Sequence, residues 1–165
     1  MIHVYYGDGK GKTTAALGLA LRALGHKKSV CIVQFLKGMP TGELSILSDA
    51  GVNILRCDTC KFIYKMTDEE KAELKKRHDE NLAHAFESCP DLLILDEAID
   101  ALSCGVLSED LLRRVIFQKP ENTELVLTGH VKIDWIFEAA DYITNMQKEK
   151  HPFDRGVPAR KGVEF

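Results

Sequence analysis

The sequence predicts a three-layer α/β fold, in which a mostly parallel β-sheet is covered by helices on both faces. Three observations lead to this prediction. Short β-rich runs alternate with helical runs along the 165 residues. Some of the β-rich runs, such as residues 92–95 (Leu-Leu-Ile-Leu), are continuously apolar, as strands buried on both faces are. The helical runs are long enough to form the crossover connections that parallel neighbouring strands require.

The strands are predicted from runs of β-branched, aromatic and aliphatic residues that lie between turn residues. They cover residues 2–6, 29–35, 52–56, 92–95, 124–128 and 142–146. The helices are predicted from apolar residues at helical spacing and from residues typical of helix ends. They cover residues 13–24, 43–50, 67–88, 108–118 and 132–140.

Capping residues support most of these helix ends. Gly25 is predicted as the C-cap of the first helix, and Gly51 ends the second. Thr67-Asp68-Glu69-Glu70 has the pattern of a capping box and opens the long charged helix, which Pro90 closes. Ser108 is predicted to cap the next helix.

Composition favours one globular domain spanning residues 1–165, with 45% hydrophobic and 28% charged residues. A net charge of -3 provides no basic field for nucleic acid, and no apolar run approaches the length that crosses a membrane. The first residues enter a predicted strand without a basic stretch, so we expect no signal peptide and a cytoplasmic protein. The tail of residues 147–165 holds two prolines and two glycines, and we expect packing or a ligand to order it.

Five cysteines, at positions 31, 57, 60, 89 and 104, are scattered through the chain. Their odd number favours reduced thiols over a disulfide framework. Cys57-Asp58-Thr59-Cys60 is a C-x-x-C motif that could form a zinc or redox site, but no second C-x-x-C accompanies it. The plainer interpretation is a strand end that runs into a loop.

A glycine-rich phosphate-binding loop follows the first strand and precedes the first helix. It reads Gly-Asp-Gly-Lys-Gly-Lys-Thr-Thr and is one residue shorter than the usual G-x-x-x-x-G-K-[ST] spacing, which would place a glycine at Tyr6. Glycines let backbone N–H groups approach phosphate oxygens, Lys12 adds a full positive charge, and the Thr13 hydroxyl can bind Mg²⁺. The alternative is a glycine-rich turn with an accidental lysine. The predicted ATP-binding residues are Gly7, Asp8, Gly9, Lys10, Gly11, Lys12, Thr13 and Thr14.

Two acidic residues, Asp96 and Glu97, follow the buried strand at residues 92–95. The carboxyl ends of parallel strands meet at one edge of a sheet, where ligands bind. We therefore expect Asp96 or Glu97 to hold Mg²⁺ with Thr13, either directly or through water. The alternative is that Glu97 and Asp100 only open a helix favourably.

Three further stretches narrow the reaction class: Gln34-Phe35-Leu36-Lys37-Gly38, Leu127-Thr128-Gly129-His130, and the last fifteen residues, His-Pro-Phe-Asp-Arg-Gly-Val-Pro-Ala-Arg-Lys-Gly-Val-Glu-Phe. Together with the short phosphate loop, they resemble the ATP:corrinoid adenosyltransferases of the CobA/BtuR type. The resemblance extends over the whole chain in matching order. It implies a RecA-like phosphate-loop NTPase fold, a homodimer, and transfer of the 5′-deoxyadenosyl group of MgATP to the cobalt of a corrinoid.

The resemblance also implies how the residues share the work. Tripolyphosphate would be the leaving group, and ATP would bind in the opposite orientation to that in other phosphate-loop enzymes. Co(I) of the corrinoid would attack C5′, so that no general base is required. Lys12, Thr13 and Glu97 would act on the triphosphate and its metal. By the same resemblance, a flavoprotein is the expected reductant, and the further nucleotide- or corrinoid-binding residues would be Lys37, Asp154, Gly156 and Lys161.

Phe62-Ile63-Tyr64 stands where the family carries aromatic side chains that displace the lower axial ligand of the corrin. The resemblance makes Phe62 and Tyr64 catalytic residues, although Tyr64 stands where tryptophan is usual. Without the resemblance, the same residues would be read as core packing.

Two other functions are compatible with a phosphate loop. A small ATPase or kinase would need a water-positioning residue or an acceptor-binding lid, and the sequence shows no clear candidate. A nucleotide-gated regulatory module could use the long charged helix at residues 67–88 to bind a partner, although such a helix is more often a solvated face. Only the adenosyltransferase would form a cobalt–carbon bond.

Overall fold

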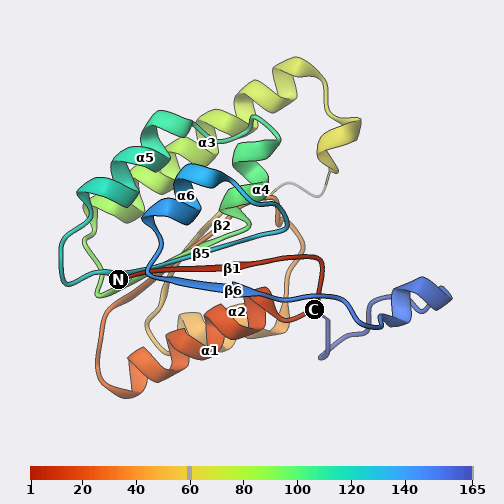
Figure 1. Cartoon of the computed structure of the whole chain (residues 1–165), viewed down its shortest axis with the longest axis horizontal. Coiled ribbons are helices and arrows are strands. Elements are labelled where there is room, and N and C mark those ends of the chain that lie inside the picture. The colour runs from red at the N-terminus through yellow and green to blue at the C-terminus, as the bar shows by residue number, and fades with distance from the viewer. Residues whose placement is uncertain (59–60, 165) are drawn as a thin grey trace.

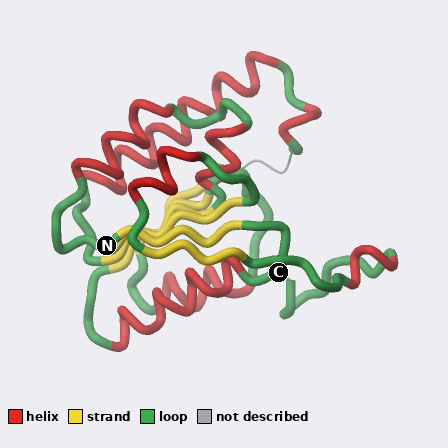
Figure 2. Tube along the Cα trace, viewed as in Figure 1, coloured by secondary structure: helices red, strands yellow, loops and turns green. Residues whose placement is uncertain are grey.

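The computed structural model describes residues 1–58 and 61–164 and contains a parallel sheet with the strand order β3-β2-β4-β5-β1-β6. Helices cover both of its faces (Figures 1 and 2). The predicted α/β class is therefore confirmed. The strands are β1 Ile2–Tyr6, β2 Val30–Gln34, β3 Asn53–Arg56, β4 Leu92–Asp96, β5 Glu124–Gly129 and β6 Tyr142–Asn145.

The α-helices are α1 Lys12–Gly25, α2 Gly42–Asp49, α3 Asp68–Glu87, α4 Ala98–Ser103, α5 Glu109–Gln118 and α6 Asp134–Ala139. Two single-turn 3₁₀ helices, η1 Ile63–Lys65 and η2 Pro152–Arg155, lie in the segment before α3 and in the C-terminal tail. No helix within the described residues is long and apolar enough to cross a membrane.

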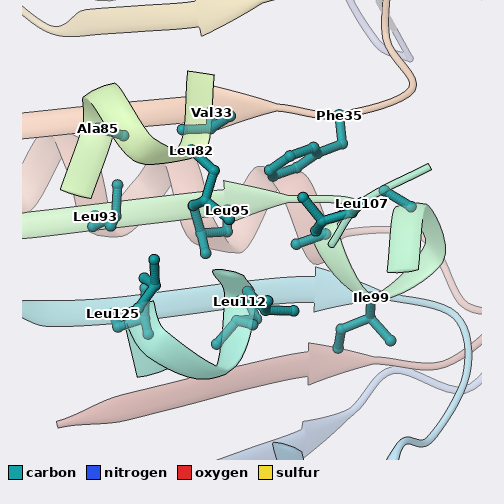
Figure 3. Packing of buried hydrophobic residues seen from close by; sticks show 14 of the residues in the cluster. Val33, Phe35, Leu82, Ala85, Leu93, Leu95, Ile99, Leu107, Leu112 and Leu125 are labelled. Atoms are coloured by element: carbon teal, nitrogen blue, oxygen red, sulfur yellow. The ribbon is translucent and has the colours of Figure 1, made fainter. Parts of the chain in front are cut away.

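Two hydrophobic cores hold the layers together, one on each face of the sheet. Helices α1 and α2 cover one face, where Ala16, Ala20 and Leu47 pack on strand residues such as Ile32 and Ile94. Helices α3, α4, α5 and α6 cover the other face. There, Leu82 of α3 lies beside Leu95 of β4, and Leu112 of α5 lies over β5 (Figure 3). The six-strand parallel sheet needs both cores, because each of its central strands is buried on both sides.

The strand order places the phosphate loop and the acidic strand end at one edge of the sheet. The loop follows β1, Asp96 ends β4, and β5 lies between these two strands. Because all the strands are parallel, the loop and Asp96 both lie at their carboxyl ends.

The capping predictions agree with the structure in the later helices. The Thr67 hydroxyl accepts a hydrogen bond from Glu70 N while the Glu70 carboxylate accepts one from Thr67 N, which confirms the capping box. The Ser108 hydroxyl caps α5. These side chains satisfy N–H groups that the first helical turn leaves without partners.

Two features differ from the sequence prediction. Gly25 is the last residue of α1 and not its C-cap; the left-handed residue is Lys27, whose N–H donates to Leu24 O. The short helix α4 is absent from the predicted set, although the alternative role of Glu97 and Asp100 implies a helix at this place. It begins directly after the acidic pair, with Glu97 as its N-cap residue.

Cys31, Cys57, Cys89 and Cys104 are free thiols. Burial raises the pKa of the Cys31 thiol to about 11, so that this thiol stays protonated at neutral pH. The second cysteine of the C-x-x-C motif, Cys60, lies outside the described residues. Within those residues, no cluster of three or more His, Cys, Asp or Glu side chains is arranged to hold a metal ion.

Candidate functional site

The phosphate loop is held against the chain that follows β6. Gly9 N donates to Met146 O over 2.7 Å. A Cβ atom at Gly9 would lie 2.6 Å from Met146 O, and one at Gly7 would lie 2.5 Å from the same oxygen. Real Cβ atoms do not approach an oxygen so closely, so both positions require glycine. The compact turn brings its backbone to the start of α1.

Helix α1 begins at Lys12 with an open N-terminus. Its N-cap residue, Gly11, contributes no side-chain hydrogen bond, and the first turn contains no acidic residue. The first N–H groups of the helix are therefore free of a side-chain cap, and the helix dipole adds partial positive charge at this end. Such an N-terminus suits an anion such as a phosphate.

The Lys12 ammonium group folds back over the loop. Its Nζ donates to Gly7 O over 2.6 Å and to Gly9 O over 2.9 Å. Partial burial lowers the pKa of Lys12, and the nearby carboxylates of Asp100 and Glu97 oppose this effect. A triphosphate would give this ammonium a full negative charge in place of the two carbonyl groups.

Asp96, at the end of β4, is fully buried and hydrogen-bonded through both oxygens. Its Oδ1 accepts bonds from the hydroxyl groups of Thr13, over 2.9 Å, and Thr128, over 2.8 Å. Its Oδ2 accepts one from Lys37 Nζ over 2.5 Å. These partners satisfy the buried carboxylate. Without them, a buried charge would strongly destabilise the folded protein.

Lys37, just beyond β2, joins the acidic pair to the phosphate loop. Its Nζ also donates to Thr13 Oγ1 over 2.9 Å and lies 3.4 Å from Glu97 Oε1. Burial alone would lower the pKa of Lys37, but the carboxylates of Asp96 and Glu97 outweigh it and raise the pKa. Lys37 is therefore a permanently charged ammonium group at neutral pH.

Glu97 differs from its neighbour Asp96 in two ways. Its backbone is left-handed, with φ of 62°, a conformation that costs free energy for a residue other than glycine. Its carboxylate is partly exposed and forms a salt bridge with Lys37. Burial raises the pKa of Glu97, and Lys37 opposes that effect. Glu97 is thus the acid of the pair with oxygen atoms available to a ligand.

Two pockets open on either side of this charged group. The first, of roughly 290 Å³, is formed mainly by the phosphate loop and also by Glu97, His130, His151, Val163 and Glu164. The second, of roughly 530 Å³, is lined mainly by apolar groups. Its lining residues are Leu36, Lys37, Gly38, Met39, Thr41, Lys61, Phe62, Ile63, Tyr64, Leu74 and Glu97. Glu97 lines both pockets, and Lys37 of the second contacts Thr13 of the first.

The aromatic side chains of the second pocket are exposed. Phe62 and Tyr64 have exposed fractions of 63% and 76%, and their rings stack with centroids 5.5 Å apart. The Lys65 ammonium group lies over both rings. The interpretation of these residues as core packing is therefore wrong. Two exposed, stacked rings beside an apolar pocket are suited to contact a flat ligand.

The C-terminal tail reaches the phosphate loop through residues other than those expected. His151, Val163 and Glu164 line the first pocket, and Lys10 Nζ donates to Val163 O over 3.4 Å. Asp154, whose carboxylate pairs with Lys148, and Gly156, which ends η2, are not in its lining. Neither is Lys161.

The sequence analysis gives His130 no role and gives Asp100 only that of a favourable charge at a helix start, but the structure pairs the two residues, and His130 lines the first pocket. The Asp100 carboxylate accepts hydrogen bonds from both the backbone and the ring of His130. The signal was present in the sequence as a histidine directly after a buried strand, Leu127-Thr128-Gly129-His130, at the edge of the sheet where the acidic pair lies.

Comparison with known proteins gives matches over the whole chain. A family model described as "ATP:corrinoid adenosyltransferase BtuR/CobO/CobP" matches residues 1–165. A corrinoid adenosyltransferase of Escherichia coli (strain K12) is 34% identical over 100% of this chain and 85% of its own length. A corrinoid adenosyltransferase of Pseudomonas aeruginosa is 34% identical over 98% of this chain and 82% of its own length. Corrinoid adenosyltransferase CobA of Salmonella typhimurium is 32% identical, covering 100% and 85%.

Proposed function

This chain belongs to the ATP:corrinoid adenosyltransferase family, and we propose that it transfers the 5′-deoxyadenosyl group of MgATP to Co(I) of a corrinoid, with release of tripolyphosphate. It is a transferase of cobalamin biosynthesis, for which ATP and a corrinoid are the substrates. One observation carries the assignment to residues: the phosphate-loop pocket and the aromatic pocket share Glu97 and are joined by Lys37. Two substrates bound on either side would meet there, as group transfer requires.

The phosphate-loop pocket is the proposed site of the triphosphate. Its glycine backbone, the open N-terminus of α1, Lys12 and Thr13 provide positive charge and hydrogen-bond donors. In the proposed reaction these groups stabilise the charge that develops on the departing tripolyphosphate. C5′ is then the reacting atom, and no water needs activation. As the family resemblance implies, ATP would bind in the opposite orientation to that in other phosphate-loop enzymes.

We propose that Mg²⁺ binds beside Lys37, held by Glu97 and by phosphate oxygens of the nucleotide. Mg²⁺ in nucleotide sites is held by one or two carboxylates and the phosphates, and it would supply positive charge to the triphosphate. Glu97 has the more accessible carboxylate and would contact the ion. Asp96, whose oxygens are already hydrogen-bonded, would orient Thr13. Lys37 Nζ lies between these three side chains, so it would have to move when the ion binds.

The aromatic pocket is the proposed site of the corrin ring. Phe62 and Tyr64 are stacked, exposed and beside an apolar wall that includes Leu36 and Leu74. We propose that the two rings press on the lower face of a Co(II) corrinoid and displace its axial ligand. A four-coordinate Co(II) is easier to reduce, so a flavoprotein would suffice as the electron donor.

The remaining features of the proposal are organisational. We propose that residues 1–165 form one domain, that the protein acts as a homodimer in the cytoplasm, and that residues 147–165 help to close the site. The last of these is supported by His151 and Glu164, which line the phosphate-loop pocket. The homodimer and the cytoplasmic location rest on the resemblance to the family.

The test is to incubate the protein with MgATP and a corrinoid that has been chemically reduced to Co(I). We expect the absorption spectrum of an adenosylcorrinoid, and phosphorus NMR should show tripolyphosphate forming in equal amount. A reaction without corrinoid is the control and should release no tripolyphosphate. ADP or phosphate as the coupled product would overturn the proposal in favour of an ATPase or a kinase.

A further inference from the structure

His130 is held in one orientation by Asp100. The backbone N–H of His130 donates to Asp100 Oδ1 over 3.0 Å, and its ring Nδ1 lies 2.9 Å from Asp100 Oδ2. One carboxylate thus binds the residue at two points, through the main chain and the ring. The arrangement fixes where Nε2, the other ring nitrogen, points.

The backbone around this pair is built for close approach. A Cβ atom at Gly129 would lie 2.5 Å from Ile99 Cβ and 3.4 Å from Asp100 N. The end of β5 can therefore lie directly against α4 only because residue 129 is glycine. This contact brings His130, the next residue, within hydrogen-bond distance of Asp100.

The orientation matters because His130 lines the phosphate-loop pocket together with Lys10 and Lys12. Within the described residues, His130 Nε2 has no hydrogen-bond partner, while Nδ1 is committed to Asp100. Charged groups that face the pocket or the pair include the acids Asp8, Glu97, Asp100 and Glu164 and the bases Lys10 and Lys12. A triphosphate in this pocket needs further cationic partners.

We propose that His130, as an imidazolium held by Asp100, donates its Nε2–H to an oxygen of the triphosphate. This inference rests on the proposed function and adds a residue to it. In the transfer, the electron pair of Co(I) forms the cobalt–C5′ bond, and the pair of the C5′–O bond stays on the α-phosphate oxygen. The charge on the tripolyphosphate rises, and a charge-assisted hydrogen bond from His130 stabilises it. Asp100 is a positioning residue that acts through His130.

The first test is calorimetric binding of inorganic tripolyphosphate to the full chain, in the presence of Mg²⁺. We expect His130→Ala to bind roughly tenfold more weakly than wild type, since the hydrogen bond joins two charged groups at a partly solvated site. His84→Ala, which removes an exposed histidine from α3, is the matched control and should bind as wild type does. Equal affinity of His130→Ala and wild type would overturn the proposal.

The second test asks whether Asp100 acts through His130. Asp100→Asn should weaken tripolyphosphate binding in the wild-type background but change it less than twofold in the His130→Ala background. Equal losses in both backgrounds would show that Asp100 acts independently and would overturn its positioning role. As a second readout, ¹⁵N NMR of the His130 ring should show both nitrogens protonated when tripolyphosphate is bound. A neutral ring in that complex would overturn the imidazolium.

These tests are independent of the reaction assay, because they contain no corrinoid. If tripolyphosphate binding depends on His130 but no adenosylcorrinoid forms, the phosphate contact stands and the proposed function fails. If adenosylcorrinoid forms but tripolyphosphate binds equally with and without His130, the proposed function stands and the contact is wrong.

Discussion

The phosphate-loop pocket and the aromatic pocket share one wall but are built by different means. In the first, nearly every polar group is held by another: Lys12 by loop carbonyls, Thr13 by Asp96, and His130 by Asp100. In the second, Tyr64 lies in the single 3₁₀ turn η1 and Phe62 directly precedes it, and both side chains are largely exposed. The phosphate-loop side of the first pocket is thus held in place without a ligand, whereas the exposed rings of the second have room to adjust.

The difference follows from what each pocket is proposed to stabilise. Charge developing on a leaving group is best stabilised by dipoles that are already in place, because reorienting them during the reaction costs free energy. Displacing an axial ligand from a large ring needs bulk on one face and can follow the shape of the ring. We therefore expect substitutions in the phosphate-loop pocket to affect every assay, and substitutions in the aromatic pocket to affect only one step.

The largest expected effect is that of Lys12→Ala. The variant removes the full positive charge that the loop offers to the triphosphate, and a charge-assisted contact of this kind is worth about 1.5–3 kcal/mol of binding. We expect ATP affinity to fall by roughly 10- to 100-fold and adenosyl transfer to be nearly lost. Calorimetry with MgATP measures the first, and the corrinoid assay measures the second. An ATP affinity equal to that of wild type would show that Lys12 does not bind the triphosphate and would contradict the role assigned to the phosphate-loop pocket.

Phe62→Ala and Tyr64→Ala should separate the two steps. With a Co(II) corrinoid and a flavoprotein reductant, we expect activity to be nearly abolished. With Co(I) generated chemically, activity should largely survive, and the affinity for ATP should stay unchanged. Because both side chains are exposed, the melting temperature should change little.

Tyr64→Trp, which restores the residue usual in the family, is the matched variant at this position. It should keep or improve the Co(II)-dependent rate. Equal losses of Phe62→Ala and Tyr64→Ala in the two assays, with a lowered melting temperature, would mean that these aromatics support the fold and do not activate the cobalt.

Substitutions of Asp96 and Glu97, which lie between the two pockets, should have effects of intermediate size. Asp96→Asn leaves Glu97 as the one carboxylate that forms a salt bridge with Lys37, and it disturbs the hydrogen bonds of a fully buried side chain. We therefore expect a loss of about 2–3 kcal/mol in the free energy of unfolding. Glu97→Gln should change stability by less and mainly raise the Mg²⁺ concentration needed for transfer. Urea denaturation and a Mg²⁺ titration of the rate measure the two effects. Similar stability losses in both variants would contradict the separate roles assigned to the acids.

The smallest expected effect concerns His78, which lies under the segment that carries Lys37. His78 is buried on α3, its ring meets Phe35 edge to face, and its Nδ1 lies 2.9 Å from Val106 O. Burial lowers its pKa below the ordinary value of 6.5. As the pH falls below 6.5, the unfolded chain therefore takes up this proton before the folded protein does. Stability is full above that pH and decreases below it.

Urea denaturation at pH 7.5 and 5.5 measures this contribution. His78→Gln keeps an N–H donor but does not titrate, so its loss of stability between the two pH values should be smaller than that of wild type. His84→Gln, at an exposed position of the same helix, should keep the wild-type loss. Identical pH dependence in His78→Gln and wild type would show that His78 does not contribute.

Local patterns were sufficient to predict most of the fold. Apolar runs and capping residues are properties of neighbouring positions, so the strands, the capping box at Thr67 and the Ser108 cap could be read from the sequence. The short helix α4 could not, since its six residues are too few to show a helical period. The capping role assigned to Gly25 was wrong because the chain continues the helix by one residue and turns at Lys27.

The candidate site was predictable where it depends on a motif and not where it depends on contacts between distant residues. The phosphate loop and the acidic pair were read from local sequence, and the structure places them at the same edge of the sheet. The bonds of Lys37 to Thr13 and Asp96 join residues from three parts of the chain, and the Asp100–His130 pair joins two. Only the strand order brings such partners together. The exposure of Phe62 and Tyr64 likewise depends on how the turn before α3 is oriented.

The C-terminal tail is attached to the phosphate loop at both of its ends. Met146 O accepts from Gly9 N at one end, and Val163 O accepts from Lys10 Nζ at the other. Closing a flexible segment of roughly 17 residues costs about 2.5 kcal/mol of chain entropy, whereas one hydrogen bond contributes about 1 kcal/mol. The far attachment alone does not offset that cost, so a triphosphate that contacts both Lys10 and the tail would supply the difference. Trypsin should accordingly cut after Arg155 and Arg160 more slowly when ATP is bound, which would make the tail a proteolytic reporter of nucleotide occupancy.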